Sequence, residues 1–171
     1  MDRKYSFPPV ADSDSRILIL GSLPGEESLR QQQYYANPRN QFWKIIFTLF
    51  HPGDSAGVEQ DKSYTEKLAF LLSHRIALWD VIANGRRQGS LDTNIRDEQS
   101  NDFATFFHDH PQIHTVFFNG VKARDTFRKK VAVPASPIRF FLLPSTSPAH
   151  TMPWETKLQQ WQAVCAARPA D

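Results

Sequence analysis

Four short, almost uninterrupted apolar runs constrain this chain of 171 residues more than any other feature. They are near-continuously apolar rather than alternating, as expected for strands covered on both faces, and they occupy residues 16–20 (RILIL), 75–79 (RIALW), 114–118 (HTVFF) and 138–143 (IRFFLL). Amphipathic helical patterns occur between and after them, at 40–50, 64–73, 102–110, 120–130 and 154–167. Because strands that alternate with helices imply parallel crossovers, we predict an α/β three-layer sandwich with a central four-stranded parallel sheet.

The length and composition indicate one globular domain. Hydrophobic residues make up 40% of the chain and charged residues 22%, which is ordinary for a domain with a sizeable core. Residues 1–15 are polar and contain prolines, so we predict an irregular N-terminal arm followed by a single domain over 16–171, with a loop at 52–62. No apolar run approaches a membrane span and the start has no signal-peptide pattern, so we expect a cytoplasmic protein.

The cysteine and charge content exclude several classes of site. The single cysteine, Cys165, permits neither a disulfide framework nor a cysteine zinc site, and the six histidines are scattered. We therefore expect no metal and no cofactor. A net charge of +2 fits weak attraction to phosphate, but a neutral enzyme without a polyanionic partner fits it as well. The absence of a G-x-G-x-x-G motif and of a Walker lysine argues against an unrelated nucleotide-binding enzyme.

The segments that follow the strands should hold the chemistry, because ligands of open parallel sheets bind beyond the carboxyl ends of the strands. These segments are rich in glycine, proline and small polar residues: 21–25 (GSLPG) with 34–43 (YYANPRNQFW) further on, then 80–87 (DVIANGRR), 119–122 (NGVK) and 144–150 (PSTSPAH). Any strand end needs turn residues, so no single segment indicates a site. Together they predict a polar site at one end of the sheet.

As a set, these motifs resemble the uracil-DNA glycosylase superfamily. Three motifs account for the resemblance: Gly-x-x-Pro-Gly after the first strand, Tyr-Ala-x-Pro-x-Asn-x-Phe-Trp at 35–43, and Pro-Ser-x-Ser-Pro-Ala at 144–149. With Leu-Trp-Asp-Val at 78–81 and Gly-Ser-Leu-Asp at 89–92, the set is most similar to the hypoxanthine-DNA glycosylase branch. The resemblance spans roughly residues 16 to 160. It implies a monofunctional DNA glycosylase that hydrolyses the N-glycosidic bond of deaminated bases, preferably hypoxanthine, in base excision repair.

The catalytic residue is the point at which the branches differ. The mismatch-specific uracil branch has a motif similar to Gly-Ile-Asn-Pro-Gly at the first turn, and the asparagine of that motif is its catalytic residue. This chain has Leu23 at the same position, and a leucine side chain cannot orient water. The resemblance to the hypoxanthine branch points to Asn40 instead. An asparagine carbonyl can align water and face the cationic sugar. Asn40 also stands directly before an apolar helix, so residue type alone favours a helix cap, and only the surrounding motif reverses that preference.

Four residues are predicted to contact the extruded base: Tyr35, Leu23, Asp80 and His150. Tyr35 matches the aromatic that stacks on the base, although a rim tyrosine with its hydroxyl in water is the ordinary alternative. Asp80 can read the base edge or merely cap a turn. His150 can contact a phosphate or polarise the leaving base, but a loop histidine is more often inert.

The loop at 144–150 resembles the one that enters the minor groove of DNA. Its two prolines lower the ordering cost on binding, and serine hydroxyls can donate to phosphates. The predicted DNA-binding residues are Ser145, Thr146, Ser147 and Pro148. Arg86 and Arg87 are either backbone contacts or solvated charges. We expect a monomer that acts on double-stranded DNA containing a deaminated base. The alternatives are a mismatch-specific uracil glycosylase and a catalytically silent DNA-binding module of the same fold.

Overall fold

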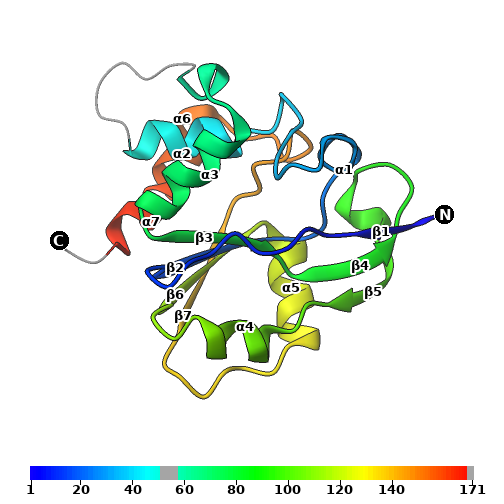
Figure 1. The fold of residues 1–171 in the computed structure, drawn as a ribbon. Helices are drawn as coiled ribbons and strands as arrows, with labels where there is room; N and C mark the ends of the chain where they lie inside the picture. The colour runs from blue at the N-terminus through cyan, green and yellow to red at the C-terminus, as the bar shows by residue number, and fades with distance from the viewer. Residues whose placement is uncertain (51–57, 169–171) are drawn as a thin grey trace.

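The central layer of the protein is a parallel sheet of four strands. The computed structural model (Figure 1) describes residues 1–50 and 58–168. The sheet has the order β3-β2-β6-β7, and its strands are β2 (Ile17–Gly21), β3 (Ile76–Asp80), β6 (Thr115–Asn119) and β7 (Arg139–Leu143). All three pairings are parallel. The four apolar runs are therefore the four strands, displaced by at most one residue, which confirms the predicted sheet.

Helices cover both faces of this sheet. On one face lie α2 (Phe42–Phe50), α3 (Tyr64–Ser73), α6 (Trp154–Trp161) and α7 (Ala163–Ala166), and on the other lie α4 (Phe103–Asp109) and α5 (Val121–Lys130) (Figure 1). Successive residues of β2 point to opposite layers, so Ile17 and Ile19 belong to the first core while Leu18 and Leu20 belong to the second. All four are completely buried, as the near-continuous apolar run requires. The predicted three-layer sandwich is confirmed.

A second, antiparallel sheet was not foreseen. It has the order β1-β4-β5, and its strands are β1 (Arg3–Tyr5), β4 (Ile82–Arg86) and β5 (Arg96–Ser100). The sequence of β5, RDEQS, has no apolar residue, so hydrophobic periodicity carries no signal for it. The N-terminal arm over residues 1–15 is consequently not irregular throughout, because β1 pairs with β4 and Val10 forms a bridge with Leu78.

Three smaller differences concern helices. The structure contains α1 (Glu26–Gln31), a six-residue helix with one buried residue, which is too short and polar to show a periodic pattern. The helix expected over 154–167 is divided into α6 and α7 at Gln162. The loop expected over 52–62 falls partly outside the described residues, and its described part contains the 3-10 helix η1 (Val58–Asp61). Within residues 1–50 and 58–168, no helix has the length and apolar character needed to cross a membrane.

Trp161 connects α6 to the segment that follows β7. Its side chain is completely buried, and its indole N–H donates a hydrogen bond of 2.9 Å to the carbonyl of Pro144. We expect Trp161→Phe to lower the free energy of unfolding by about 1–3 kcal/mol, because the carbonyl loses its partner. Trp154→Phe, at a half-buried position on the same helix, is the control. Equal losses in urea denaturation for the two variants would contradict the importance of this bond.

Candidate functional site

The carboxyl ends of β2 and β3 meet where Gly21 pairs with Asp80. A Cβ atom added to Gly21 would lie 2.6 Å from Asp80 Oδ1 and 2.8 Å from the Tyr35 hydroxyl oxygen. Both contacts are closer than a Cβ atom ordinarily approaches, so a side chain at this position would force Asp80 and Tyr35 to move. The structure therefore brings Tyr35 and Asp80, two residues predicted to bind the base, to the same point at the end of β2.

Tyr35 is held in a fixed orientation. Its backbone has a φ of 55°, in the left-handed region that non-glycine residues rarely adopt. One face of its ring stacks on Phe42, with centroids 4.2 Å apart and planes 26° apart. Burial, and then the charge of Asp80, raise the pKa of Tyr35, so its hydroxyl stays protonated. Tyr34 points away from this site and is buried, and its hydroxyl donates to the carbonyl of Pro8.

Asn119, the last residue of β6, connects Tyr35 to the 144–150 loop. Its Nδ2 donates to the Tyr35 hydroxyl at 3.1 Å and to Thr146 Oγ1 at 3.0 Å, and its Oδ1 accepts the Thr146 N–H at 2.9 Å. The following Gly120 has a φ of +96°, and an added Cβ there would lie 3.1 Å from Ser145 Cβ. Residue type alone indicates only the turn residues that any strand end needs. In the structure, Asn119 connects the end of β6 to both Tyr35 and the 144–150 loop.

The loop is also anchored at both of its ends. The Pro144 carbonyl accepts from Trp161, and the His150 carbonyl accepts from Lys157 Nζ at 3.0 Å. Lys157 is 1% exposed, and burial lowers its pKa. A lysine in a polar helical segment is ordinarily solvated, so the sequence contained no signal for this role. The loop is thus ordered without a ligand, which reduces the entropy lost on binding.

The four residues predicted to bind DNA divide into two groups. Thr146 is buried, and its N–H, hydroxyl and carbonyl all bond within the protein, the last with the Gln41 N–H at 3.0 Å. It supports the loop and does not reach outward. Pro148 is exposed, while Ser145 and Ser147 are half-buried and their hydroxyls accept N–H groups two residues ahead. His150 is exposed at the end of the same loop.

Asn40 lies two residues before Phe42, the first residue of α2. Its side-chain Oδ1 accepts the Phe42 N–H at 3.0 Å, so the capping geometry expected from residue type is present. The next residue, Gln41, bonds the carbonyl of Thr146, which places Asn40 beside the loop. An amide oxygen has two lone pairs, and the second remains able to accept from a water molecule. The cap and a role in water alignment are therefore compatible.

Leu23 occupies a small apolar cluster and not an open position. It is 6% exposed and packs with Ile82 and Ile95, between the turn after β2 and the antiparallel sheet. This contact fastens the turn to β4. In the structure, the Leu23 side chain, which has no hydrogen-bonding atom, therefore packs inside the protein.

Asp80 is a buried carboxyl group with an unused oxygen. It is 4% exposed, and its Oδ2 has no hydrogen-bond partner among the described residues. Burial, and then the negative charge of Asp92, raise the pKa of Asp80 to about 7, while Arg87 acts in the opposite direction. The group is consequently poised to exchange a proton near neutral pH.

Arg87 is buried, although its position beside Arg86 suggested a solvated or phosphate-binding charge. It is 1% exposed, its Nε donates to the Gly89 carbonyl at 2.8 Å, and its Nη2 donates to the Pro24 carbonyl. Its Nη1 has no partner among the described residues. Arg86 is the last residue of β4 and Arg87 lies just beyond it, so only knowledge of this strand and of its end would have separated the two arginines.

The segment that contains Arg87 is fastened to the turn after β2 at two further points. Ser22 Oγ donates to Asp92 Oδ1 at 2.7 Å, and the Glu26 N–H donates to Ser90 Oγ at 2.9 Å. Burial raises the pKa of Asp92, and the hydrogen bond from Ser22 opposes that effect. The Gly-Ser-Leu-Asp motif at 89–92 thus holds the Gly-Ser-Leu-Pro-Gly turn in place.

A hollow of roughly 400 Å³ lies away from this site, between α2 and the C-terminal helices. Its lining is mostly apolar, and its one reactive group is the Cys165 thiol, whose pKa is raised by burial. In the part of the chain that the structure describes, no group of three histidine, cysteine or acidic residues could hold a metal ion. The titratable groups gather at the carboxyl edge of the sheet instead.

The raised pKa of Asp80 predicts a pH-dependent stability difference. The folded state holds the proton up to about pH 7 and the unfolded state loses it near 3.8, so this group's contribution falls as pH rises between these values. Asp80→Asn cannot ionise. Its free energy of unfolding should therefore rise relative to wild type by roughly 4 kcal/mol from pH 4 to pH 8, at about 1.4 kcal/mol per pH unit. A constant difference across urea titrations at these pH values would contradict a buried acid.

Comparison with known proteins agrees with this arrangement. A model of the Uracil DNA glycosylase superfamily matches residues 8–167. A protein from Methanosarcina acetivorans named hypoxanthine DNA glycosylase is 40% identical over 162 residues, which cover 94% of this chain and 97% of the relative. A protein of the same name from Methanosarcina barkeri is 41% identical over 121 residues, covering 71% and 73% of the two chains.

The fold also matches a solved structure. The solution NMR structure of a candidate uracil DNA glycosylase from Methanosarcina acetivorans superimposes with a TM-score of 0.78 and 37% identity. The match covers 95% of this chain and 96% of that one. The chain belongs to the uracil DNA glycosylase superfamily.

Proposed function

We propose that this protein is a monofunctional DNA glycosylase that hydrolyses the N-glycosidic bond of deaminated bases in double-stranded DNA, with a preference for hypoxanthine. The observation that carries the proposal is the 40% identity, across almost the whole of both chains, with a relative named hypoxanthine DNA glycosylase. The substrate is a duplex, and the enzyme acts in base excision repair as a cytoplasmic monomer. Its single glycosylase domain extends over residues 16–171 and is joined by strand β1 of the N-terminal arm.

The base-binding part of the mechanism rests on Tyr35 and Asp80. The free face of the Tyr35 ring stacks on the extruded base, since Phe42 covers the opposite face. Hypoxanthine offers O6 and N7 as acceptors. Asp80 Oδ2 has no partner among the described residues but is covered by neighbouring atoms, so protonated Asp80 donates to one of these acceptors once the bound base uncovers it. A buried donor draws negative charge onto the purine as it leaves. His150 on the adjoining loop is a second candidate donor.

The sugar side of the reaction is assigned to Asn40. Its carbonyl keeps one lone pair beyond the bond to the Phe42 N–H, and that lone pair aligns a water molecule toward C1′. Leu23 has no polar atom to share this task. The loop wedges into the duplex with Pro148 at its exposed part, Ser145 and Ser147 donate to phosphates, and Thr146 supports them from below.

The absence of lyase activity is part of the same proposal. A lyase would need a lysine amine to form a Schiff base with the sugar. The two lysines of the motif segments are engaged elsewhere, since Lys44 lies 4.2 Å from the Trp154 ring centroid and Lys122 pairs with Glu98 at 3.0 Å. Hydrolysis by a positioned water requires neither a metal nor a cofactor.

A catalytically silent DNA-binding module is the second candidate. The observation that favours it is that the Asn40 carbonyl already caps α2, while Leu23 occupies the position of the polar residue in the mismatch-specific branch. A module of this kind would bind a deoxyinosine duplex and release no base. The two predictions below separate it from the enzyme.

Substitutions of Asn40 test the catalytic assignment. Asn40→Ala should slow single-turnover excision about a hundredfold, the effect of losing roughly 3 kcal/mol of transition-state stabilisation. Asn40→Ser is the matched control, because serine caps a helix as well as asparagine but is too short to reach the water. It should retain the thermal stability of wild type and still be slow. If Asn40→Ala and Asn40→Asp excise at the full rate, Asn40 is only a cap.

Substrate preference tests the choice of branch. We expect faster single-turnover release of hypoxanthine from a deoxyinosine duplex than of uracil from a deoxyuridine duplex with the same opposing base. The physical reason is that one donor at Asp80 serves the acceptors of a purine, and a poorly paired inosine is extruded more easily. Faster release of uracil would indicate the mismatch-specific branch. Release of neither base would favour the silent module.

A further inference from the structure

Three arginines lie in direct register across the antiparallel sheet. Arg3 of β1 is paired with Arg86 of β4, and Arg86 is paired with Arg96 of β5. Directly paired residues of neighbouring antiparallel strands share one face of the sheet, and like charges opposite each other are destabilising. We call these three residues the arginine row. An arrangement that opposes folding points to a partner that offsets the repulsion.

The protein itself neutralises this row only weakly. Among the described residues, Asp97 is the one carboxylate within 4 Å of the three guanidinium groups, at 3.9 Å from Arg86 Nε. That pair is open to solvent, with 53% of the Arg86 side chain and 70% of the Asp97 side chain exposed, so its attraction is small. Arg3 and Arg96 donate to neutral oxygens, which are Asn84 Oδ1 and the carbonyls of Thr93, Ile95 and Asp97. A guanidinium has five N–H donors, so each arginine keeps several for a ligand.

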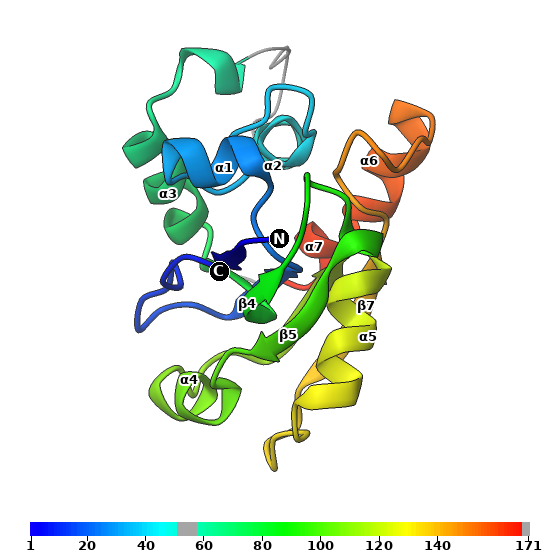
Figure 2. The same cartoon turned by 90° about the vertical axis from the view of Figure 1, so that its right-hand side faces the viewer.

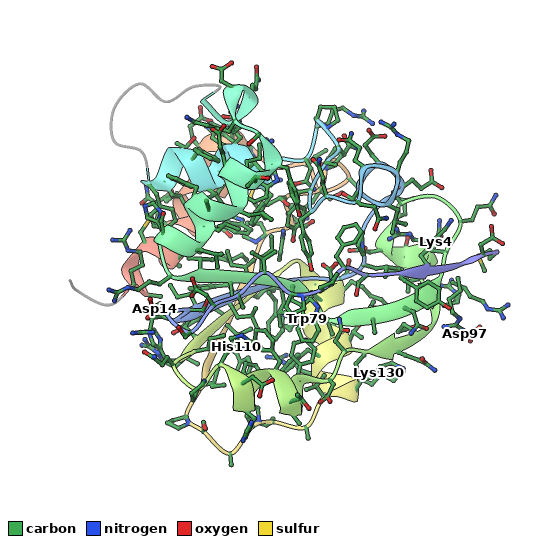
Figure 3. All side chains as sticks on the ribbon, in the orientation of Figure 1. Lys4, Asp14, Trp79, Asp97, His110 and Lys130 are labelled. Carbon is green, nitrogen blue, oxygen red and sulfur yellow. The ribbon has the colours of Figure 1, made fainter. Side chains whose placement is uncertain are left out.

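The two faces of the antiparallel sheet differ in what they meet. One face packs on the rest of the protein, through Ile95 against Leu23 and through Glu98, which pairs with Lys122 of α5 at 3.0 Å. Figure 2 shows α5 beside β5 on that side. The row lies on the other face, where Tyr5 is 61% exposed. Figure 3 places Asp97 at the outer edge of the sheet, away from the helices that cover the first core.

The row is also close to the candidate site. β4 begins two residues after Asp80, and six residues of extended chain from Asp80 to Arg86 span at most about 20 Å. Duplex DNA advances about 3.4 Å per base pair, so this reach corresponds to roughly six base pairs. Both features extend beyond the carboxyl edge of the parallel sheet (Figure 1).

We propose that the arginine row binds the phosphate backbone of duplex DNA on one side of the extruded nucleotide. The choice of DNA as the polyanion rests on the proposed function. The row crosses three strands and so spans about 10 Å, which fits a continuous line of charges spaced about 1.7 Å apart along the duplex axis and not a single phosphate. Arginine forks pair with phosphate oxygens in a bidentate manner. The contact carries no base information, so it strengthens binding to any sequence.

The test compares two triple variants with the same change in charge. The first is Arg3→Gln/Arg86→Gln/Arg96→Gln. The second is Arg16→Gln/Arg75→Gln/Arg139→Gln, at the amino ends of β2, β3 and β7, which is the opposite edge of the parallel sheet. The dissociation constant for an undamaged duplex is measured between 50 mM and 200 mM salt, after circular dichroism has shown that both variants are folded. The row variant should lose at least tenfold in affinity and reduce the salt slope by roughly 2 to 3, since each phosphate contact contributes about 0.9.

A third variant acts in the opposite direction. Asp97 has a φ of 52°, which asparagine tolerates, so Asp97→Asn removes the one described carboxylate within 4 Å of the row without added backbone strain. It should tighten binding to the undamaged duplex severalfold. Equal losses in both triple variants, or an unchanged salt slope in the row variant, would overturn the proposal, as would weaker binding by Asp97→Asn. Failure of the proposed function is seen separately, as absence of base release by the wild-type protein that binds the same duplex through the row.

Discussion

The missing side chain at Gly21 is the constraint on which the site depends. The carboxyl ends of parallel strands lie at one edge of the sheet, and a glycine there lets neighbouring side chains approach the backbone closely. The Asp80 carboxyl and the Tyr35 hydroxyl lie so close to Gly21 that a Cβ atom there would push both of them away. Asn119, at the end of the next strand, then connects Tyr35 to the loop beyond β7. Three strand ends are in this way joined into a single polar surface.

The buried polar groups of this site lower the stability of the fold. Asp80 Oδ2 and Arg87 Nη1 lack hydrogen-bond partners among the described residues, and each belongs to a side chain that is almost completely buried. An unpaired buried polar atom is usually destabilising by 1–3 kcal/mol, which proteins tolerate mainly where a ligand or a proton completes the pairing. The raised pKa of Asp80 is a consequence of the same burial. The hydrophobic cores on both faces of the parallel sheet stabilise the fold and offset this cost.

The two sheets have different tasks. The parallel sheet is covered on both faces and orients the side chains of the site with little freedom. The antiparallel sheet packs on one face and leaves the other to solvent, as such sheets can. Because β4 follows β3 after a single residue, Val81, the exposed sheet is a direct extension of the strand that carries Asp80. A rigid site and an adjoining charged surface therefore arise from one continuous stretch of chain.

Residue pattern alone predicts the parallel sheet, the helices that cover it and the edge at which the polar segments collect. These follow from local hydrophobic period and from the rule that strand ends of one direction meet, so they need no knowledge of distant contacts. Long-range contacts bury Thr146 and Lys157, pack Leu23 against Ile82 and Ile95, and leave Arg86 exposed while Arg87 is buried. These contacts join residues that are far apart in the chain, so residue pattern does not encode them. β5 shows this most clearly, because it has no apolar residue and is formed by backbone pairing, and the side-chain directions on its sheet depend on the register of that pairing.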